Sequence, residues 1–234
     1  MSQRSTIIIR HHYSMKKIIY LAFTALLCVS CFQVNPIFKG DKHANVVVKD
    51  ESAAITKSFD FKDFDAICIN GYADITFTQS DNWEVTLRTR ESVLDHLDYK
   101  VEDGVLFIQT KKHRTIRVGK VEYDLTIQAP NLRRIEMNGA GDFELSAGLH
   151  TEGDLEIELN GAGDIECKDI TCNKLSVEIN GLGDVYVSGK AEEACFDVSG
   201  AGDIDASDLT VTGEVHRQST SGLVMFKGPH RNSD

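Results

Sequence analysis

The sequence is poor in proline, tryptophan and basic residues. Its 234 residues include 3 prolines, one tryptophan and 25 lysines and arginines, against 36 aspartates and glutamates, and its formal charge at pH 7 is −11. Nucleic acid binding needs clustered Lys and Arg to replace the counterions condensed on phosphates. The deficit of basic residues therefore argues against a nucleic acid partner. The one basic stretch, residues 111–120, is interpreted as a solvated hairpin or loop.

Several motifs of metal and phosphate chemistry are also missing. The eight histidines never show the His-Glu-x-x-His spacing of zinc proteases. The Gly-x-Gly phrases lack the following helix and lysine that a phosphate-cradling loop requires. The overall composition, 41% hydrophobic and 26% charged, is nevertheless that of an ordinary globular protein. A sizeable core is therefore expected, but no cofactor and no metal ion.

The first thirty residues have the pattern of an export signal. From Met15, which we take as the true start, the chain runs through Lys16 and Lys17 into the apolar stretch 18–27 and reaches Cys31. The apolar stretch is too short for a permanent membrane span, which needs roughly 20 residues. The segment resembles a bacterial lipobox, although Cys28 stands where leucine is usual. The resemblance implies cleavage before Cys31 and diacylation of its thiol.

Processing at this site would leave a strongly acidic mature chain. Residues 1–30 contain four basic and no acidic residues, so their removal lowers the formal charge from −11 to −15. Such a charge opposes electrostatic attachment to anionic lipids, which leaves the acyl chains as the membrane anchor. Residues 31–55 are interpreted as a linker from the lipid, residues 56–228 as a single domain and residues 229–234 as a polar tail.

Four cysteines follow Cys31, and none of them forms a Cys-x-x-Cys pair. This spacing supports neither a zinc site nor a redox site. Strand alternation predicts that Cys167 points inward as a buried thiol and that Cys68 and Cys195 point outward. One disulfide among Cys68, Cys172 and Cys195 is left open, because disulfides persist in exported proteins.

A short phrase, Asn-Gly-x-Gly-Asp, recurs with variations along the chain. The first glycines of its last five copies are 22, 20, 19 and 22 residues apart, and apolar residues alternate on both sides of each copy. Alternation with a period of two is typical of β-strands. The six copies, of which the last is decayed, are residues 69–75, 137–143, 159–165, 179–185, 198–204 and 220–222.

A period near twenty residues with two or three short strands fits a β-solenoid, in which each coil stacks on the last and buries a continuous core. We therefore predict an all-β fold, a parallel β-helix with coils of about 20 residues. Equivalent residues then lie about 4.8 Å apart. Asn138, Asn160 and Asn180 should form a hydrogen-bonded ladder, continued by Ser199 and Ser221. Propeller blades are the alternative, but their repeats usually run near 40 to 50 residues.

The two ends of the repeat region look different from its middle. In the decayed copy, alternation places His216, Gln218 and Thr220 at inward positions. These residues are too polar to be covered by another coil, so the copy is predicted to be a C-terminal cap. Residues 59–121 are interpreted as an irregular N-terminal β part. Its strand-like runs are residues 66–78, 83–89 and 105–110, with one or two helical turns in residues 91–98.

The recurrent phrase, the segments Phe59-Asp60-Phe61 and Phe64-Asp65-Ala66-Ile67 before Asn70-Gly71, and the lipobox together resemble the family named putative auto-transporter adhesin, head GIN domain. The resemblance covers roughly residues 55–226. It implies a parallel β-helix in an extracytoplasmic protein, typical of Bacteroidetes-like bacteria, and no established activity. Ala73 departs from the pattern because it replaces the second glycine, so the first turn is expected to differ.

Two columns of acidic residues are the candidates for chemistry. Acid and base catalysis needs two groups made unlike by their surroundings, whereas stacked repeats make them alike. Each aspartate after a turn is interpreted as capping backbone N–H groups in its own turn, and calcium binding by the columns is the alternative. The columns are Asp142, Asp164, Asp184 and Asp203 after the turns, and Glu136, Glu158, Glu178 and Asp197 facing outward before them.

The sequence thus predicts a non-catalytic lipoprotein of the outer membrane, anchored at Cys31 and facing the periplasm or the cell surface. Its expected role is adhesin-like contact with glycan or envelope protein through broad outer faces. The residues after Cys31, 32–35, lack the acidic run associated with surface export, which favours the periplasm. A polysaccharide-cleaving β-helix enzyme and a structural or envelope-sensing periplasmic domain are the alternatives.

Overall fold

The computed structural model describes residues 45–48, 53–111, 115–118 and 123–228. Contacts divide the chain into residues 1–42 and 43–234, and every described residue belongs to the second unit. The predicted signal segment, Cys31 and the tail at 229–234 lie outside the described residues. No helix in the described part is long and apolar enough to cross a membrane.

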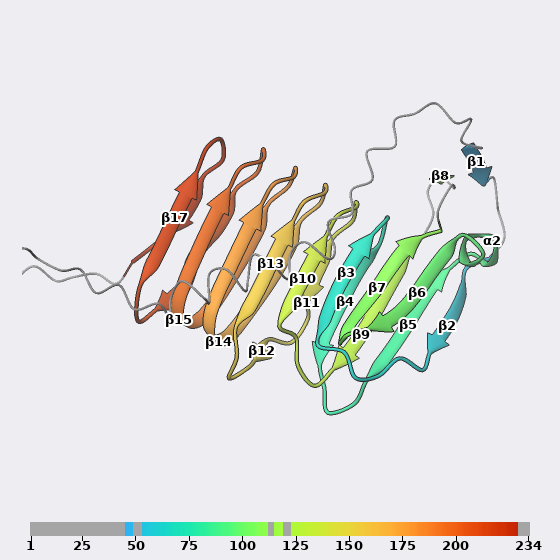
Figure 1. Ribbon diagram of the computed structural model, residues 1–234, viewed down its shortest axis with the longest axis horizontal. Coiled ribbons are helices and arrows are strands. Elements are labelled where there is room, and N and C mark those ends of the chain that lie inside the picture. The colour runs from blue at the N-terminus through green and yellow to red at the C-terminus, as the bar shows by residue number, and fades with distance from the viewer. Residues whose placement is uncertain (1–44, 49–52, 112–114, 119–122, 229–234) are drawn as a thin grey trace, which may run out of the picture. The chain divides into compact units, whose positions relative to one another are not determined.

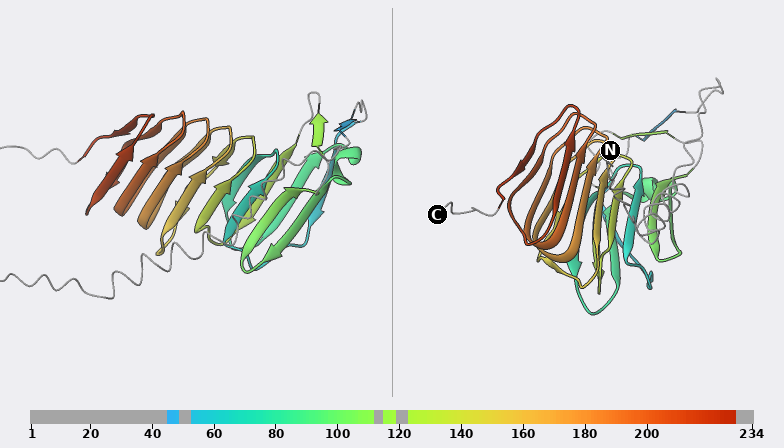
Figure 2. Two further views of the ribbon diagram at one scale, coloured as in Figure 1. Left: turned by 45° about the horizontal axis from the view of Figure 1, so that its top comes forward. Right: turned by 60° about the vertical axis from the view of Figure 1, so that its left-hand side comes forward.

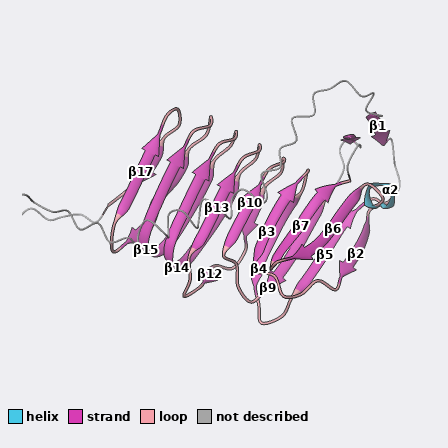
Figure 3. Cartoon of the chain, in the orientation of Figure 1, coloured by secondary structure: helices cyan, strands magenta, loops and turns pink. Residues whose placement is uncertain are grey.

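Strands make up nearly all of the regular structure (Figure 3). Sixteen strands form one sheet, and its main path runs in the order β2-β5-β9-β4-β11-β14-β13-β10-β3-β7-β6. The remaining strands extend this path: β12 and β15 pair with β14, β16 and β17 pair with β15, and β18 pairs with β16. The only described helix is α2 (Glu91–Leu94), one turn long. The strands are β2 (Ile55–Phe59), β3 (Ala66–Asn70), β4 (Asp74–Gln79), β5 (Glu84–Thr89), β6 (Leu97–Glu102), β7 (Val105–Thr110), β9 (Asp124–Ala129), β10 (Arg134–Met137), β11 (Phe143–Leu145), β12 (Leu149–His150), β13 (Leu155–Leu159), β14 (Ile165–Ile179), β15 (Val185–Val198), β16 (Ile204–Val211), β17 (Val215–Ser219) and β18 (Val224–Phe226).

The N-terminal strands are the irregular part of the sheet, as expected. β5 pairs antiparallel with both β2 and β9, and β6 and β7 form an antiparallel hairpin. A separate two-stranded sheet joins β1 (Asn45–Val48) and β8 (Thr115–Val118) in parallel. The predicted run 66–78 is broken at residues 71–73, where the first turn separates β3 from β4.

From β3 onward the repeat copies pair with each other in parallel and in register. The strand before each turn places one apolar residue opposite its equivalent in the next copy, and each of these residues is fully buried. Full burial of such a side chain contributes about 1.5–3 kcal/mol. The column consists of Ile69, Met137, Leu159, Ile179 and Val198.

Figure 1 shows these copies side by side from β3 to β17, and Figure 2 shows the same strands bending into a curled, open sheet. The bend follows from the turns and corners, which separate two or three short strands in each copy. The predicted all-β class is confirmed. The sheet is open rather than closed, and the parallel β-helix stays a prediction.

Glycines make the close stacking of the turns possible. A Cβ on Gly161 would lie 1.8 Å from the carbonyl oxygen of Gly139 in the preceding copy, so only a residue without a side chain fits there. The second glycine of the phrase has a further reason, since Gly163 has a φ of 141°. Ala73 has no positive φ, so the first turn differs from the turns at Gly141, Gly163 and Gly183, whereas Gly202 also has no positive φ.

The register of the last copy differs from the sequence prediction. Val215, rather than His216, lies opposite the inward Ala194, and the inward positions continue with Arg217 and Ser219, so the assignment of Gln218 and Thr220 is also wrong by one residue. The reason is a turn that is one residue shorter than the others. Five residues lead from Ser219 to Val224, against six from Val198 to Ile204 in the copy before it.

Candidate functional site

An asparagine ladder runs along the turns and confirms the prediction. The amide of Asn160 donates to the side-chain oxygen of Asn138, and the amide of Asn180 donates to that of Asn160, each at 3.0 Å. The ladder also extends to Asn70, which accepts from Asn138 at 3.0 Å. The predicted continuation by Ser199 and Ser221 is wrong, since the Ser199 hydroxyl donates to Asp197 and the Ser221 hydroxyl donates to the Gly200 carbonyl oxygen. These amides are therefore occupied by holding neighbouring copies together.

The aspartate column after the turns has the same structural role. Oδ1 of Asp164 accepts the backbone N–H of Asp184 at 2.8 Å, and Oδ1 of Asp184 accepts that of Asp203 at 2.8 Å. Asp142 and Asp203 act alike, the latter on Leu223. The carboxylates do cap backbone N–H groups, but those of the next copy, which corrects the expected cap within each turn.

The outward acidic column contains a basic residue that the sequence analysis missed. Arg134 makes ion pairs with Glu136 and Glu158 at 3.0 Å and with Glu156 at 3.5 Å. Burial raises the pKa of Glu158, and the Arg134 charge opposes this shift. A signal existed in the sequence, because Arg134 stands two residues before Glu136 and so shares its strand face. Farther along the same column, Glu178 lies opposite Glu158, and Asp197 lies opposite Glu178.

No disulfide joins the four described cysteines, so the disulfide left open by the sequence is not formed. Cys167 is buried as predicted, and burial raises its pKa to about 12. Burial likewise raises the pKa of Cys172 to about 11. Cys68 was expected outside but is buried, where its Sγ accepts hydrogen bonds from the Asn70 and Asn138 amides. Thiols with raised pKa are poor nucleophiles, so they support no catalytic role.

Metal binding finds no support in the described part of the chain. No group of three or more His, Cys, Asp or Glu side chains there is arranged to hold a metal ion. In the aspartate column, one carboxylate oxygen of each of Asp142, Asp164, Asp184 and Asp203 is used by a backbone N–H.

An open groove of about 550 Å³ lies beside the middle of β14 and β15. Such a volume falls in the range of small-ligand sites, about 300–1,000 Å³. Its floor and two walls come from β14, β15 and the segments next to β12 and β16. The lining residues are Thr151, Glu152, Thr171, Cys172, Asn173, Lys190, Ala191, Glu192 and Thr212.

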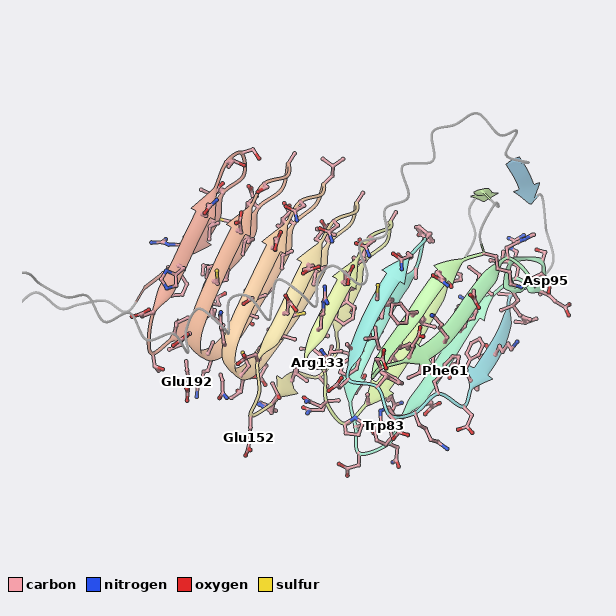
Figure 4. All side chains as sticks on the ribbon, in the orientation of Figure 1. Phe61, Trp83, Asp95, Arg133, Glu152 and Glu192 are labelled. Atoms are coloured by element: carbon pink, nitrogen blue, oxygen red, sulfur yellow. The ribbon has the colours of Figure 1, made fainter. Side chains whose placement is uncertain are left out.

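The strand register explains the shape of this groove. Cys172 and Ala191 lie opposite each other with their side chains turned inward, and both are small, so they form a low floor. Thr171 and Lys190 stand on one side of this floor, and an outward row stands on the other. The outward row is Glu152, Asn173, Glu192 and Thr212. Figure 4 shows Glu152 and Glu192 projecting from the same edge of the sheet.

The comparison with protein families identifies one family. The model of the family described as putative auto-transporter adhesin, head GIN domain, matches residues 63–224. No curated protein matches the chain.

Several solved structures share the fold. A putative adhesin from Bacteroides fragilis is 24% identical with a TM-score of 0.68, over 79% of this chain and 100% of that one. A putative lipid binding protein from Parabacteroides distasonis is 22% identical with a TM-score of 0.62, over 76% and 84% of the two chains. A putative adhesin from the same species is 15% identical with a TM-score of 0.54, over 76% and 99%. At these identities the likeness concerns the fold alone.

Proposed function

Because the chain belongs to the family described as putative auto-transporter adhesin, head GIN domain, we propose that it is a non-catalytic, adhesin-like binding module of the bacterial cell envelope. It is anchored in the outer membrane by a lipid on Cys31, and residues 31–55 link the anchor to the domain. The domain is a parallel β-helix whose outer faces contact glycan or envelope protein.

One observation carries this proposal. Outward residues of successive copies line up in rows because the copies pair in register along a column of five buried residues. Rows of this kind form a broad and rigid surface, which suits an extended partner better than a small molecule. The same register places the four aspartates after the turns in like surroundings, because each accepts a backbone N–H of the next copy. This favours a binding role over the polysaccharide-cleaving alternative, which needs two carboxylates set apart by their environment.

Protease treatment of intact and permeabilised cells tests the location and the adhesin role. Digestion of the protein on intact cells is the expected result for an adhesin-like module. Protection until the outer membrane is permeabilised would place the domain in the periplasm. That outcome would overturn the adhesin role and support the structural or envelope-sensing alternative. A periplasmic marker protein, which should resist digestion in intact cells, is the control for membrane integrity.

A further inference from the structure

We propose that the groove between Thr171 and Asn173 binds a neutral glycan chain that lies along the stack of repeat copies. This inference rests on the proposed function and names the binding surface and the class of ligand. The groove crosses four copies, and at about 4.8 Å per copy it is roughly 14 Å long. An extended chain fits this shape better than a compact ligand.

The polar groups of the walls match a polyhydroxyl ligand. Thr171 and Thr212 offer hydroxyls that both donate and accept, and the Asn173 side chain keeps its oxygen as an acceptor while its amide donates to the Glu152 carbonyl. Sugar hydroxyls need donors and acceptors together.

The charges of the walls favour a neutral glycan over an anionic one. Lys190 stands on one wall and Glu192 on the other, both exposed. Within the described residues, neither side chain makes an ion pair or a hydrogen bond that would occupy it. With Glu152 nearby, the groove presents two carboxylates and one ammonium group. These groups carry a net negative charge, so a polyanion would be repelled.

The backbone of the groove argues against a peptide strand as the occupant. Peptides often bind by adding a strand to an open sheet edge, where unpaired backbone groups are exposed. Here β14, β15 and β16 pair with each other throughout the floor, from Thr171 opposite Lys190 to Ala191 opposite Val211. The groove therefore offers side chains and no free edge.

The test uses the full chain, purified from membranes in a sugar-free detergent. Isothermal titration calorimetry with maltohexaose, cellohexaose, xylohexaose and mannohexaose measures binding, and hexagalacturonate serves as the anionic comparison. We expect at least one neutral chain to bind and hexagalacturonate not to bind. Thr171→Trp, which fills the groove from an exposed position, should weaken binding by about tenfold or more. Thr126→Trp, an exposed threonine of β9 outside the groove, should change it by less than about twofold.

The other outcomes separate the groove from the wider function. Absence of binding to all four neutral chains, or equal binding by the two tryptophan variants, overturns the glycan groove. If cells expose the domain to protease but no glycan binds, the adhesin role survives and only this inference fails. Release of new reducing ends from a bound chain would instead support the polysaccharide-cleaving alternative and overturn a purely binding groove. Unchanged far-UV circular dichroism in both variants shows that the fold is retained.

Discussion

The side-chain amide of Asn160 donates to Oδ1 of Asn138 at 3.0 Å, although the two residues are 22 positions apart in the chain. The same Asn160 accepts from Asn180 at 3.0 Å through its own Oδ1. One side chain thus joins three repeat copies. This double role makes the ladder a structural element that is additional to the backbone pairing of the sheet.

Replacing Asn160 by alanine should remove two ladder hydrogen bonds. At about 0.5–1.5 kcal/mol for each bond, we expect the free energy of unfolding to fall by about 1–3 kcal/mol. Urea denaturation measures the change. Ser199→Ala is the control, because Ser199 lies in the same row but its hydroxyl bonds only within its own copy, and it should cost less. Equal losses for the two variants would contradict a role for the ladder.

The close stacking of the turns predicts a large difference between two Gly to Ala substitutions. In Gly161→Ala the new Cβ would lie 1.8 Å from the Gly139 carbonyl oxygen, so the copies must separate. We expect a loss of about 3 kcal/mol or more, or failure to fold. Gly153→Ala is the matched control, because its nearest atom would be Thr151 Oγ1 at 3.5 Å, and it should change stability by about 0.5 kcal/mol or less. Thermal and urea unfolding would reveal a wrong prediction as similar values for both.

Replacing Arg134 and replacing Glu158 should have opposite effects on the stability of the domain. Arg134→Met leaves three carboxylates close together without their partner, so stability at pH 7 should fall by about 2 kcal/mol or more. In Glu158→Gln the outcome differs, because burial raises the pKa of Glu158 and its ionised form is therefore unfavourable in the folded protein. The glutamine variant should be at least as stable as the parent at pH 7.

The pH dependence of this cluster follows from the same shift. The folded protein holds the Glu158 proton more tightly than the unfolded chain, so this group lowers stability as pH rises through the interval between its unfolded pKa and its raised folded pKa. Below the unfolded value, the penalty disappears. The advantage of Glu158→Gln should therefore shrink when urea denaturation is repeated at pH 4. An advantage that grows on acidification would contradict the assignment.

The aspartate column predicts that calcium does not stabilise the domain. One oxygen of Asp164 already accepts the Asp184 N–H, and Asp142 does the same for Asp164. Addition of millimolar CaCl2 should leave the Tm unchanged, and MgCl2 is the control for ionic strength. A rise in Tm with calcium alone would show that the columns bind the ion. Asp164→Asn keeps an acceptor oxygen and should be milder than Asp164→Ala.

If a lipid on Cys31 anchors the protein, replacing the sulfur of this residue by oxygen should change where the protein is found. Cys31→Ser removes the thiol that the lipobox resemblance marks for acylation, so the protein should leave the membrane fraction and lose the mass of the acyl chains. Fractionation and intact-mass spectrometry measure both effects. Cys28→Ser is the control and should remain in the membrane. Retention of Cys31→Ser in the membrane would contradict the anchor.

The sequence predicts the columns well because they depend only on period and alternation. The contact between Asn138 and Asn160 follows from their equal places in the recurrent phrase. The inward position of Cys167 follows from the alternation of its strand. Arg134 was missed because it occurs in only one copy, so a comparison of the copies does not point to it. The burial of Cys68 also depends on its surroundings rather than on its strand position.

Local irregularities set the limit of what the sequence could predict. The copies are not of equal length, and one-residue bulges absorb the differences, for example between Cys167 and Ile170 of β14. A bulge changes which residues lie opposite each other without changing the phrase on either side. The groove depends on Cys172 lying beside Ala191 after such a bulge, and the inward position of Arg217 depends on a shortened turn. Neither could be derived from spacing alone.

The register between Leu159 and Ile179 has a consequence for how such chains diversify. Each copy presents to its successor the same columns that it receives from its predecessor. Residues 160–179 could therefore be duplicated or lost as a unit, and Leu159 would still meet an equivalent partner. The length of the domain could then differ between related proteins by whole copies, while its two distinct ends remain unchanged.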